Sequence, residues 1–161
     1  MKNIYLPLAK FVAAACLISG TSALAHEGRT APTPEGGLSW QVLASSEVIP
    51  WRDETTGREH IRPGFSPGAL ALRDKQVTLS GFMMPLEENA GEQTRFLLFE
   101  SAPDCLFHMA VGPTRFVEVH TSEPVKVTQR PLVLRGTMRL VEKDRGGVFY
   151  RIDGSQLVSV L

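Results

Sequence analysis

The stretch "QVTLSGFMM", residues 76–84, alternates apolar and polar side chains, with Val77 and Leu79 on one face. A period of two is the pattern of a β-strand with one buried face. Gly81 lies inside the same run, and Gly136 lies inside a later one. A glycine within a strand marks a bulge or a tight bend, which lets a short sheet curl. The two glycines therefore predict a closed barrel rather than an open sandwich.

Further β-prone runs follow at close spacing, separated by turn residues. They are "TRFLLFE" (94–100), "RFVEVHT" (115–121), "PLVLRGTMRLVE" (131–142), "GVFYRID" (147–153) and "QLVSVL" (156–161). With the first stretch they make five or six strands, and such spacing is typical of small all-β domains. We predict an all-β fold with minor α content, a small five-stranded β-barrel of the oligonucleotide/oligosaccharide-binding (OB) type.

A short helical cover is predicted upstream of these strands. In "FSPGALAL", residues 65–72, Ser66 is a suitable N-cap and Pro67 suits the first helical position, so one helical turn is expected. Residues 38–51 contain apolar anchors whose period fits neither helix nor strand, and we expect a short helix or an irregular covering element there. Residues 38–161 then form a single barrel domain.

Residues 1–25 have the order of a secretory signal peptide. Lys2 and Lys10 precede an apolar run, and a small-residue A-x-A sequence ends at Ala25. The apolar run is shorter than the roughly 20 residues needed to cross a bilayer. We expect cleavage after Ala25, export to the periplasm and no membrane-embedded segment. Residues 26–37, rich in Gly, Pro, Thr and charge, predict a flexible leader.

The composition is that of an ordinary globular protein, 43% apolar and 21% charged, with 17 basic and 17 acidic residues. Removal of Lys2 and Lys10 with the signal peptide leaves a small excess of negative charge. Such a chain has no basic footprint for a polyanion, so nucleic-acid partners are not expected.

The mature chain holds one cysteine, because Cys16 leaves with the signal peptide and Cys105 remains. One thiol excludes an intrachain disulfide and a dithiol oxidoreductase. Cys105 lies in the connection "SAPDCLFHMAVGPT", residues 101–114, which is longer than most loops in a small domain. Loops of this length tend to be functional or disordered.

Cys105 and His108 have the C-x-x-H spacing that lets a turn bring a thiolate and an imidazole to one ion. His120, at the end of the next strand, is the nearest further donor, and Glu118 shares its side-chain parity. Cys105, His108 and His120, with Glu118 or water, predict a tetrahedral zinc site. Copper(I) is the alternative ion, since thiolate, imidazole and the thioether of Met109 or Met84 suit it.

Two further interpretations arise from the same residues. A lone loop cysteine is often a small buried apolar residue, and the loop is then a docking surface of an envelope complex. A cysteine near a histidine also suits a nucleophile and its base. No Asn or Asp is positioned to orient His108, so we expect no enzymatic activity.

Five short elements between residues 77 and 125 carry a family resemblance. They are Gly81-Phe82, Pro85-Leu86-Glu87, Phe96-Leu97-Leu98, Cys105 and Val117-Glu118-Val119. The chain resembles a family of uncharacterised exported bacterial proteins, a domain of unknown function. Its members carry a Cys-x-His-Val-Pro-Pro loop or a Cys-Pro-x-Cys loop. Compared with the second form, Leu106 replaces the proline and His108 replaces the second cysteine, which removes a disulfide partner but keeps a metal ligand.

The resemblance also implies a cellular context. Relatives of this type are found beside a periplasmic metal-binding protein and an ABC transporter in zinc-responsive operons. On this basis the expected function is zinc binding in metal trafficking, with a periplasmic metal chaperone or the transporter as partner.

Overall fold

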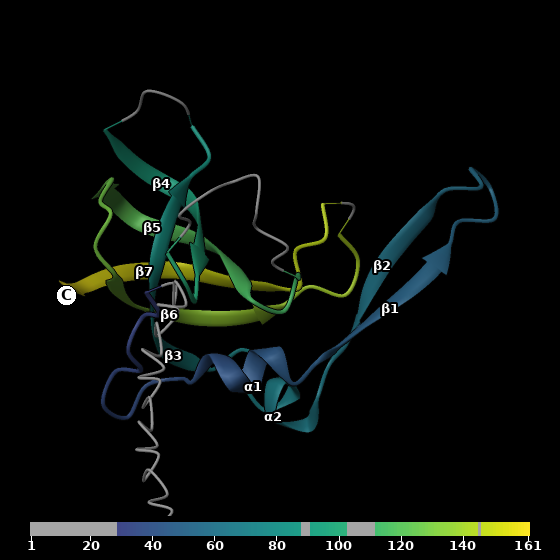
Figure 1. Ribbon diagram of the computed structural model, residues 1–161, viewed down its shortest axis with the longest axis horizontal. Helices are drawn as coiled ribbons and strands as arrows, with labels where there is room; N and C mark the ends of the chain where they lie inside the picture. Colours follow the sequence, from purple (N-terminus) through teal and green to yellow (C-terminus); the bar gives the residue numbers. More distant parts are fainter. Residues whose placement is uncertain (1–28, 88–90, 103–111, 145) are drawn as a thin grey trace, which may run out of the picture.

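The computed structural model of the protein describes residues 29–87, 91–102, 112–144 and 146–161. In chain order its elements are α1 (Trp40–Ala44), β1 (Glu47–Arg52), β2 (Glu59–Gly64), α2 (Pro67–Leu70), β3 (Gln76–Pro85), β4 (Glu92–Phe99), β5 (Phe116–Lys126), β6 (Leu132–Leu140) and β7 (Tyr150–Val160). Strands β3, β4, β5, β7 and β6, in this spatial order, close into a barrel (Figure 1). The predicted all-β barrel is confirmed.

Neighbouring barrel strands are antiparallel, except that β5 and β7 are parallel. The chain runs through β3, β4 and β5 in succession and then inserts β7 between β5 and β6. Such a five-stranded closed barrel is OB-like. The predicted runs 147–153 and 156–161 contribute to one strand, β7, so the barrel has five strands rather than six.

Two glycines lie where barrel closure needs a close approach of backbones. β3 pairs with β6 as far as Gly81 and with β4 beyond it, so the strand changes partners at this residue. A Cβ atom on Gly81 would lie 2.7 Å from the carbonyl oxygen of Phe99, and one on Gly136 would lie 2.9 Å from the Cα of Ser155. Only a residue without a side chain fits these two positions.

Gly136→Ala is expected to lower the free energy of unfolding by about 1–3 kcal/mol, because the added methyl group overpacks against the β7 backbone. Equilibrium urea denaturation measures this change. Gly91→Ala is the matched control, since a Cβ there meets nothing within 4 Å, and its effect should stay within about 0.5 kcal/mol. Equal effects of the two substitutions would contradict the close-approach explanation.

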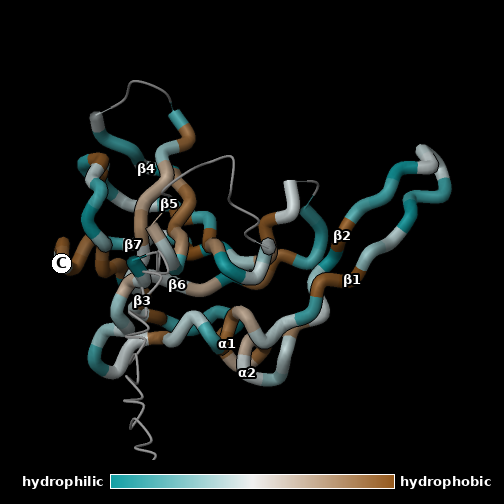
Figure 2. The backbone as a smooth tube through the Cα atoms, viewed as in Figure 1, coloured by the Kyte–Doolittle hydropathy of each residue, from teal (hydrophilic) through white to brown (hydrophobic). Residues whose placement is uncertain are grey.

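The barrel strands and both helices share one hydrophobic core. Its members include Trp40, Leu43, Ala69, Leu79, Phe96, Leu98, Val117, Val119, Leu132, Leu134, Met138, Tyr150 and Ile152. Hydrophobic residues accordingly concentrate on the barrel strands and on the two helices, whereas the far end of the β1–β2 hairpin is hydrophilic (Figure 2). The core therefore lies inside the barrel and beneath the helices.

Hydrogen bonds tie the region of α1 to the barrel. The indole Nε1 of Trp40 donates to the carbonyl oxygen of Ser80 at 2.7 Å. The buried hydroxyl of Tyr150 donates to the carbonyl oxygen of Leu43 at 2.9 Å and lies 2.6 Å from the hydroxyl of Ser46. Burial raises the pKa of Tyr150, partly opposed by the hydrogen bond with Ser46. The phenol is therefore a fixed structural donor between the barrel and its cover.

Tyr150→Phe is expected to lower the free energy of unfolding by about 1–3 kcal/mol, because the Leu43 carbonyl loses a donor in a buried place. Ser46→Ala, made alone and together with Tyr150→Phe, completes a double-mutant cycle measured by urea denaturation. We expect non-additive effects, since Tyr150 and Ser46 share one hydrogen bond. Strictly additive effects would show that the two groups are not coupled.

The predicted helical cover is confirmed. α2 begins as predicted, with Pro67 in its first turn and the side chain of Ser66 accepting from the backbone N–H of Ala69 at 3.2 Å. α1 forms the first part of the covering element predicted over residues 38–51. No helix in the described ranges has the length and hydrophobicity to span a bilayer.

β1 and β2 form a hairpin that is not predicted from the sequence. It interrupts the expected cover over residues 38–51 and extends away from the barrel (Figure 1). Its turn includes Gly57, with φ of 69°, and the carboxylate of Asp53 accepts from two backbone N–H groups. Both faces of the hairpin are largely exposed. No apolar alternation therefore marks its strands.

The predicted leader spans residues 26–37. Its described part, from residue 29 onward, contacts the barrel. Thr30 forms an isolated bridge with Ser101. The backbone N–H of Ala31 donates to the carbonyl oxygen of Glu100 at 2.8 Å, and Ala31 is buried. Backbone hydrogen bonds need no apolar period, so the composition of this segment did not reveal the contact.

Candidate functional site

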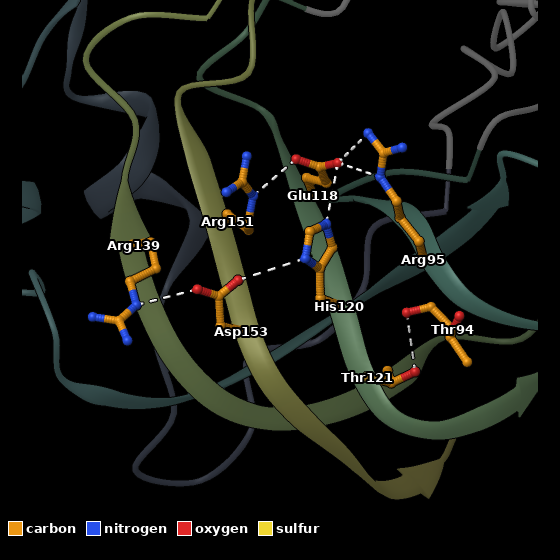
Figure 3. Close-up of polar contacts among 8 residues, drawn as sticks. All are labelled: Thr94, Arg95, Glu118, His120, Thr121, Arg139, Arg151 and Asp153. Atoms are coloured by element: carbon orange, nitrogen blue, oxygen red, sulfur yellow. Dashed lines mark hydrogen bonds and ion pairs between the residues drawn. The ribbon is translucent and has the colours of Figure 1, made fainter.

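Charged side chains gather on the outer face of β4, β5 and β7 (Figure 3). Glu118 and His120 flank the buried Val119 on β5 and point to the same side, which confirms their predicted parity. The strand register sets Arg95 of β4 opposite His120 and Arg151 of β7 opposite Glu118. Ionisable groups from three strands therefore meet on one face.

Glu118 lies at the centre of this group, and its side chain is only 2% exposed. Its Oε1 lies 2.6 Å from both Nε and Nη2 of Arg95, and its Oε2 accepts from Nε of Arg151 at 3.0 Å. A buried carboxylate is costly unless it is paired and hydrogen-bonded. Here each oxygen accepts from a guanidinium group, which offsets the cost.

The pKa of Glu118 reflects two opposing effects. Burial raises it, while the hydrogen bonds from Arg95 and Arg151 and the nearby imidazole of His120 lower it by more, so that the net pKa lies below its ordinary value. Charge-assisted hydrogen bonds to the ionised form are the dominant effect. Glu118 is therefore a carboxylate at neutral pH.

His120 lies between two carboxylates. Its Nε2 is 3.3 Å from Oε1 of Glu118, and its Nδ1 is 3.7 Å from Oδ1 of Asp153. The Nε2 contact has ion-pair distance without hydrogen-bond geometry, so this buried nitrogen has no hydrogen-bond partner among the described residues. The imidazole side chain as a whole is 40% exposed. It is thus accessible from solvent while its Nε2 faces inward.

A second set of contacts fixes Asp153. Its Oδ2 accepts from Nε of Arg139 on β6 at 3.2 Å, and Arg139 also pairs with Asp74. These pairs extend the contacts of Glu118 and His120 across a fourth strand (Figure 3). We call the set Arg95, Glu118, His120, Arg139, Arg151 and Asp153 the charged face.

Glu118 and His120 are predicted from the sequence, whereas their neighbours Arg95, Arg151 and Asp153 are not. All three lie in runs that were recognised as strands, where parity indicates their direction. Which strands stand side by side is a matter of register and topology, and neither follows from parity. The partners of Glu118 therefore follow only from the way the strands pair in the closed barrel.

The structure brings together two of the four predicted metal ligands, Glu118 and His120. Cys105 and His108 lie outside the described residues. Within the described ranges, no group of three or more His, Cys, Asp or Glu side chains is arranged to hold a metal ion. Glu118 and His120 are therefore the two predicted ligands that the described residues bring together, and they do not form a metal site by themselves.

Fold and site together define a small OB-like barrel protein with a buried carboxylate clamped by arginines on its outer face. The chain belongs to the DUF3299 family, described as a protein of unknown function, whose family model matches residues 57–158. The expected membership of a family of unknown function is confirmed. The matched range contains every residue of the charged face. No curated protein matches the chain.

A solved structure also resembles this chain. It is the crystal structure of a DUF3299 family protein from Pseudomonas aeruginosa PAO1, with 26% sequence identity and a TM-score of 0.45. The alignment covers 56% of this chain and 62% of that chain. The similarity thus spans less than two thirds of the Pseudomonas protein.

Glu118→Gln is expected to lower the free energy of unfolding by about 2 kcal/mol at neutral pH, because a neutral amide leaves two guanidinium groups poorly compensated. The expected loss is smaller than for a fully buried ion pair, because the Arg95 side chain is 61% exposed and solvent screens its charge. Urea denaturation measures the loss. Glu123→Gln, on an exposed part of the same strand, is the matched control and should change little.

The same comparison has a defined pH dependence. Because the folded-state pKa of Glu118 lies below the ordinary 4.5, its stabilisation is complete above that ordinary value and disappears as the pH falls through the lowered pKa. The difference between wild type and Glu118→Gln should therefore shrink between about pH 5 and pH 2. An equally large difference at both ends of this range would contradict the role of the ionised carboxylate.

Proposed function

We propose that the protein is a non-enzymatic periplasmic zinc-binding protein acting in metal trafficking. Cys105, His108 and His120 are the proposed protein ligands, with Glu118 or water in the fourth position. A thiolate and imidazoles at tetrahedral geometry are the ligand set that zinc prefers. A periplasmic metal chaperone or an ABC transporter is the proposed partner.

The observation that supports this proposal is the buried Nε2 of His120. It has no hydrogen-bond partner among the described residues and faces Oε1 of Glu118 at 3.3 Å. Two ligand atoms that share a tetrahedral zinc with bonds of about 2.0–2.1 Å lie about 3.4 Å apart. The separation therefore fits a zinc ion bound by both atoms.

The arginines around Glu118 are compatible with such a role. Of the two Arg95 nitrogens that lie 2.6 Å from Oε1, Nε is the one that donates a hydrogen bond. A carboxylate oxygen has two lone pairs, so Oε1 retains one for a metal. Metal-binding carboxylates are commonly held by hydrogen bonds of this kind. If Glu118 instead stays wholly with its arginines, water takes the fourth position.

The loop that carries Cys105 and His108 joins β4 to β5, the strand of Glu118 and His120. The rings of Phe99 and Phe116, where β4 ends and β5 begins, are 5.7 Å apart. Glu118 is two residues along β5 from Phe116, about 7 Å in an extended strand. The proposed loop ligands are therefore attached to the end of β5 at which Glu118 lies.

Copper(I) is the alternative ion, because thiolate, imidazole and the thioether of Met109 or Met84 suit a soft cation. The alternative class is an interaction module in which Cys105 is structural. The observation that favours this class is the projecting hairpin, where the Trp51 side chain is 44% exposed and stacks on His60. Exposed tryptophans are frequent anchors of protein interfaces.

Native mass spectrometry of the chain beginning at His26, with and without zinc, tests the proposal. We expect one zinc ion bound with a sub-micromolar Kd. Cys105→Ser, His108→Ala and His120→Ala should each weaken binding by at least about tenfold. His60→Ala, on the hairpin, is the matched control and should bind as wild type does. Parallel titration with copper(I) under reducing conditions identifies the preferred ion.

Absence of zinc binding at sub-micromolar concentrations would refute the zinc proposal. So would unchanged binding by both loop variants, Cys105→Ser and His108→Ala. Zinc bound equally by all the variants, His60→Ala included, would indicate adventitious binding.

A further inference from the structure

We propose that the last part of β7, residues 156–160, is an interaction surface at which two copies of this chain pair strand to strand. We call this segment the open edge. The proposal concerns assembly, goes beyond the proposed function and does not depend on zinc binding. It rests on the pairing, the exposure and the charge of the segment.

Among the described residues, the backbone of the open edge is paired on one side. Its partner there is β6, through the pairs Leu134↔Leu157, Val133↔Ser159 and Leu132↔Val160. On its other side β7 pairs with β5, and the last pair of that ladder is Thr121↔Ser155. Beyond this pair the end of β5 pairs with β4 instead. The open edge thus has one free side, and it lies on the side of the barrel remote from the β1–β2 hairpin (Figure 1).

The side chains of the open edge are apolar and exposed. Leu157, Val158 and Val160 have exposed fractions of 42%, 58% and 39%, and hydrophobic residues accordingly mark this end of the chain (Figure 2). A barrel strand ordinarily buries every second side chain. β7 does so from Tyr150 to Ile152, whereas every residue from 156 to 160 is exposed. Apolar side chains gathered on one exposed element indicate an interaction surface.

The open edge lacks the usual protection of a free strand. Natural proteins place prolines and charged side chains on exposed edges, which prevents pairing with other chains. The hairpin follows this rule, with Pro50 in β1, Pro63 in β2 and charged residues in both strands. The sequence of the open edge, "QLVSV", has neither a proline nor a charged residue, and a bulge at Val158 is the irregularity in its ladder with β6. A neutral edge of high β-propensity is suited to pairing with another strand.

A second copy of the open edge is the partner that this composition favours. A strand without charge has no electrostatic basis for selecting a charged partner, whereas two copies of it meet without like charges opposite each other. Twofold symmetry is the commonest symmetry of soluble oligomers, and it pairs two identical strands antiparallel. Such pairing uses the free side of both open edges, so the assembly stops at a dimer.

The neighbouring strand limits the register of this pairing. Thr121 occupies the edge of β7 at Ser155, so a second strand can pair only beyond that residue. Full antiparallel overlap of residues 156–160 with their copies sets the central residue, Val158, opposite itself. A charge introduced at Val158 is therefore brought against the same charge in the dimer.

Sedimentation equilibrium of the chain beginning at His26 tests the proposal. The paired segment is short compared with a standard stable interface, which buries about 1,600 Å². We therefore expect a dimer that dissociates on dilution, with an average mass that rises from one chain toward two between about 1 µM and 1 mM. Val158→Lys should weaken association by at least about tenfold, because like charges then stand opposite each other. Val48→Lys, at a 42% exposed position of the hairpin, is the matched control and should associate as wild type does.

A charge-pairing experiment tests the twofold register. Val158→Glu alone should associate as weakly as Val158→Lys, whereas an equimolar mixture of the two variants should recover association, since opposite charges then face each other. Hydrogen exchange locates the contact: the backbone amides of residues 156–160 should exchange more slowly at high than at low concentration in wild type. This difference should be absent in Val158→Lys. Circular dichroism checks that the variants fold, which the exposure of Val158 leads us to expect.

A monomer over the whole concentration range would overturn the proposal. So would a dimer that Val158→Lys leaves intact, because the contact would then lie elsewhere on the molecule. Association that continues beyond two chains would contradict twofold pairing. Co-sedimentation of a monomer with phosphatidylcholine vesicles, abolished by Val158→Lys, would assign the open edge to a membrane surface instead.

Discussion

The charged face depends on one constraint, the burial of the Glu118 carboxylate on the outside of the barrel. A charge that is 2% exposed needs partners, and β5 cannot supply them alone. Arg95 comes from β4 and Arg151 from β7, so the ion pairs link β5 both to the preceding strand and to a strand distant in sequence. The same arrangement brings His120 beside a carboxylate. The buried carboxylate of Glu118 thus links the barrel strands and also lies at the centre of the candidate site.

Barrel closure and site geometry are also coupled through the backbone. Gly136 allows β6 to approach β7 closely, and Gly154 lets β7 bulge at the same level. The bulge turns Asp153 toward His120. A regular β7 strand would pair without interruption, but it would not place two consecutive residues opposite His120. The bulge therefore brings Asp153 beside His120, a contact that barrel closure alone does not require.

The proposed site divides its ligands between two kinds of structure. His120 and Glu118 stand on a barrel strand whose direction is set by packing and ion pairs, while Cys105 and His108 belong to the long connection between β4 and β5. Rigid strands fix geometry, and loops tolerate the sequence changes that tune chemistry. Replacement of a cysteine by His108, suggested by the family resemblance, is a change of that second kind.

The sequence by itself determined the barrel strands, the barrel and the shared face of Glu118 and His120, because alternation and strand glycines are local signals. It also located the cap of α2 at Ser66. It did not reveal the β1–β2 hairpin, whose exposed faces leave no apolar period. Nor did it reveal the roles of Arg151 and Asp153. Those were decided only by the tertiary structure, since the register between strands far apart in the chain selects which side chains meet.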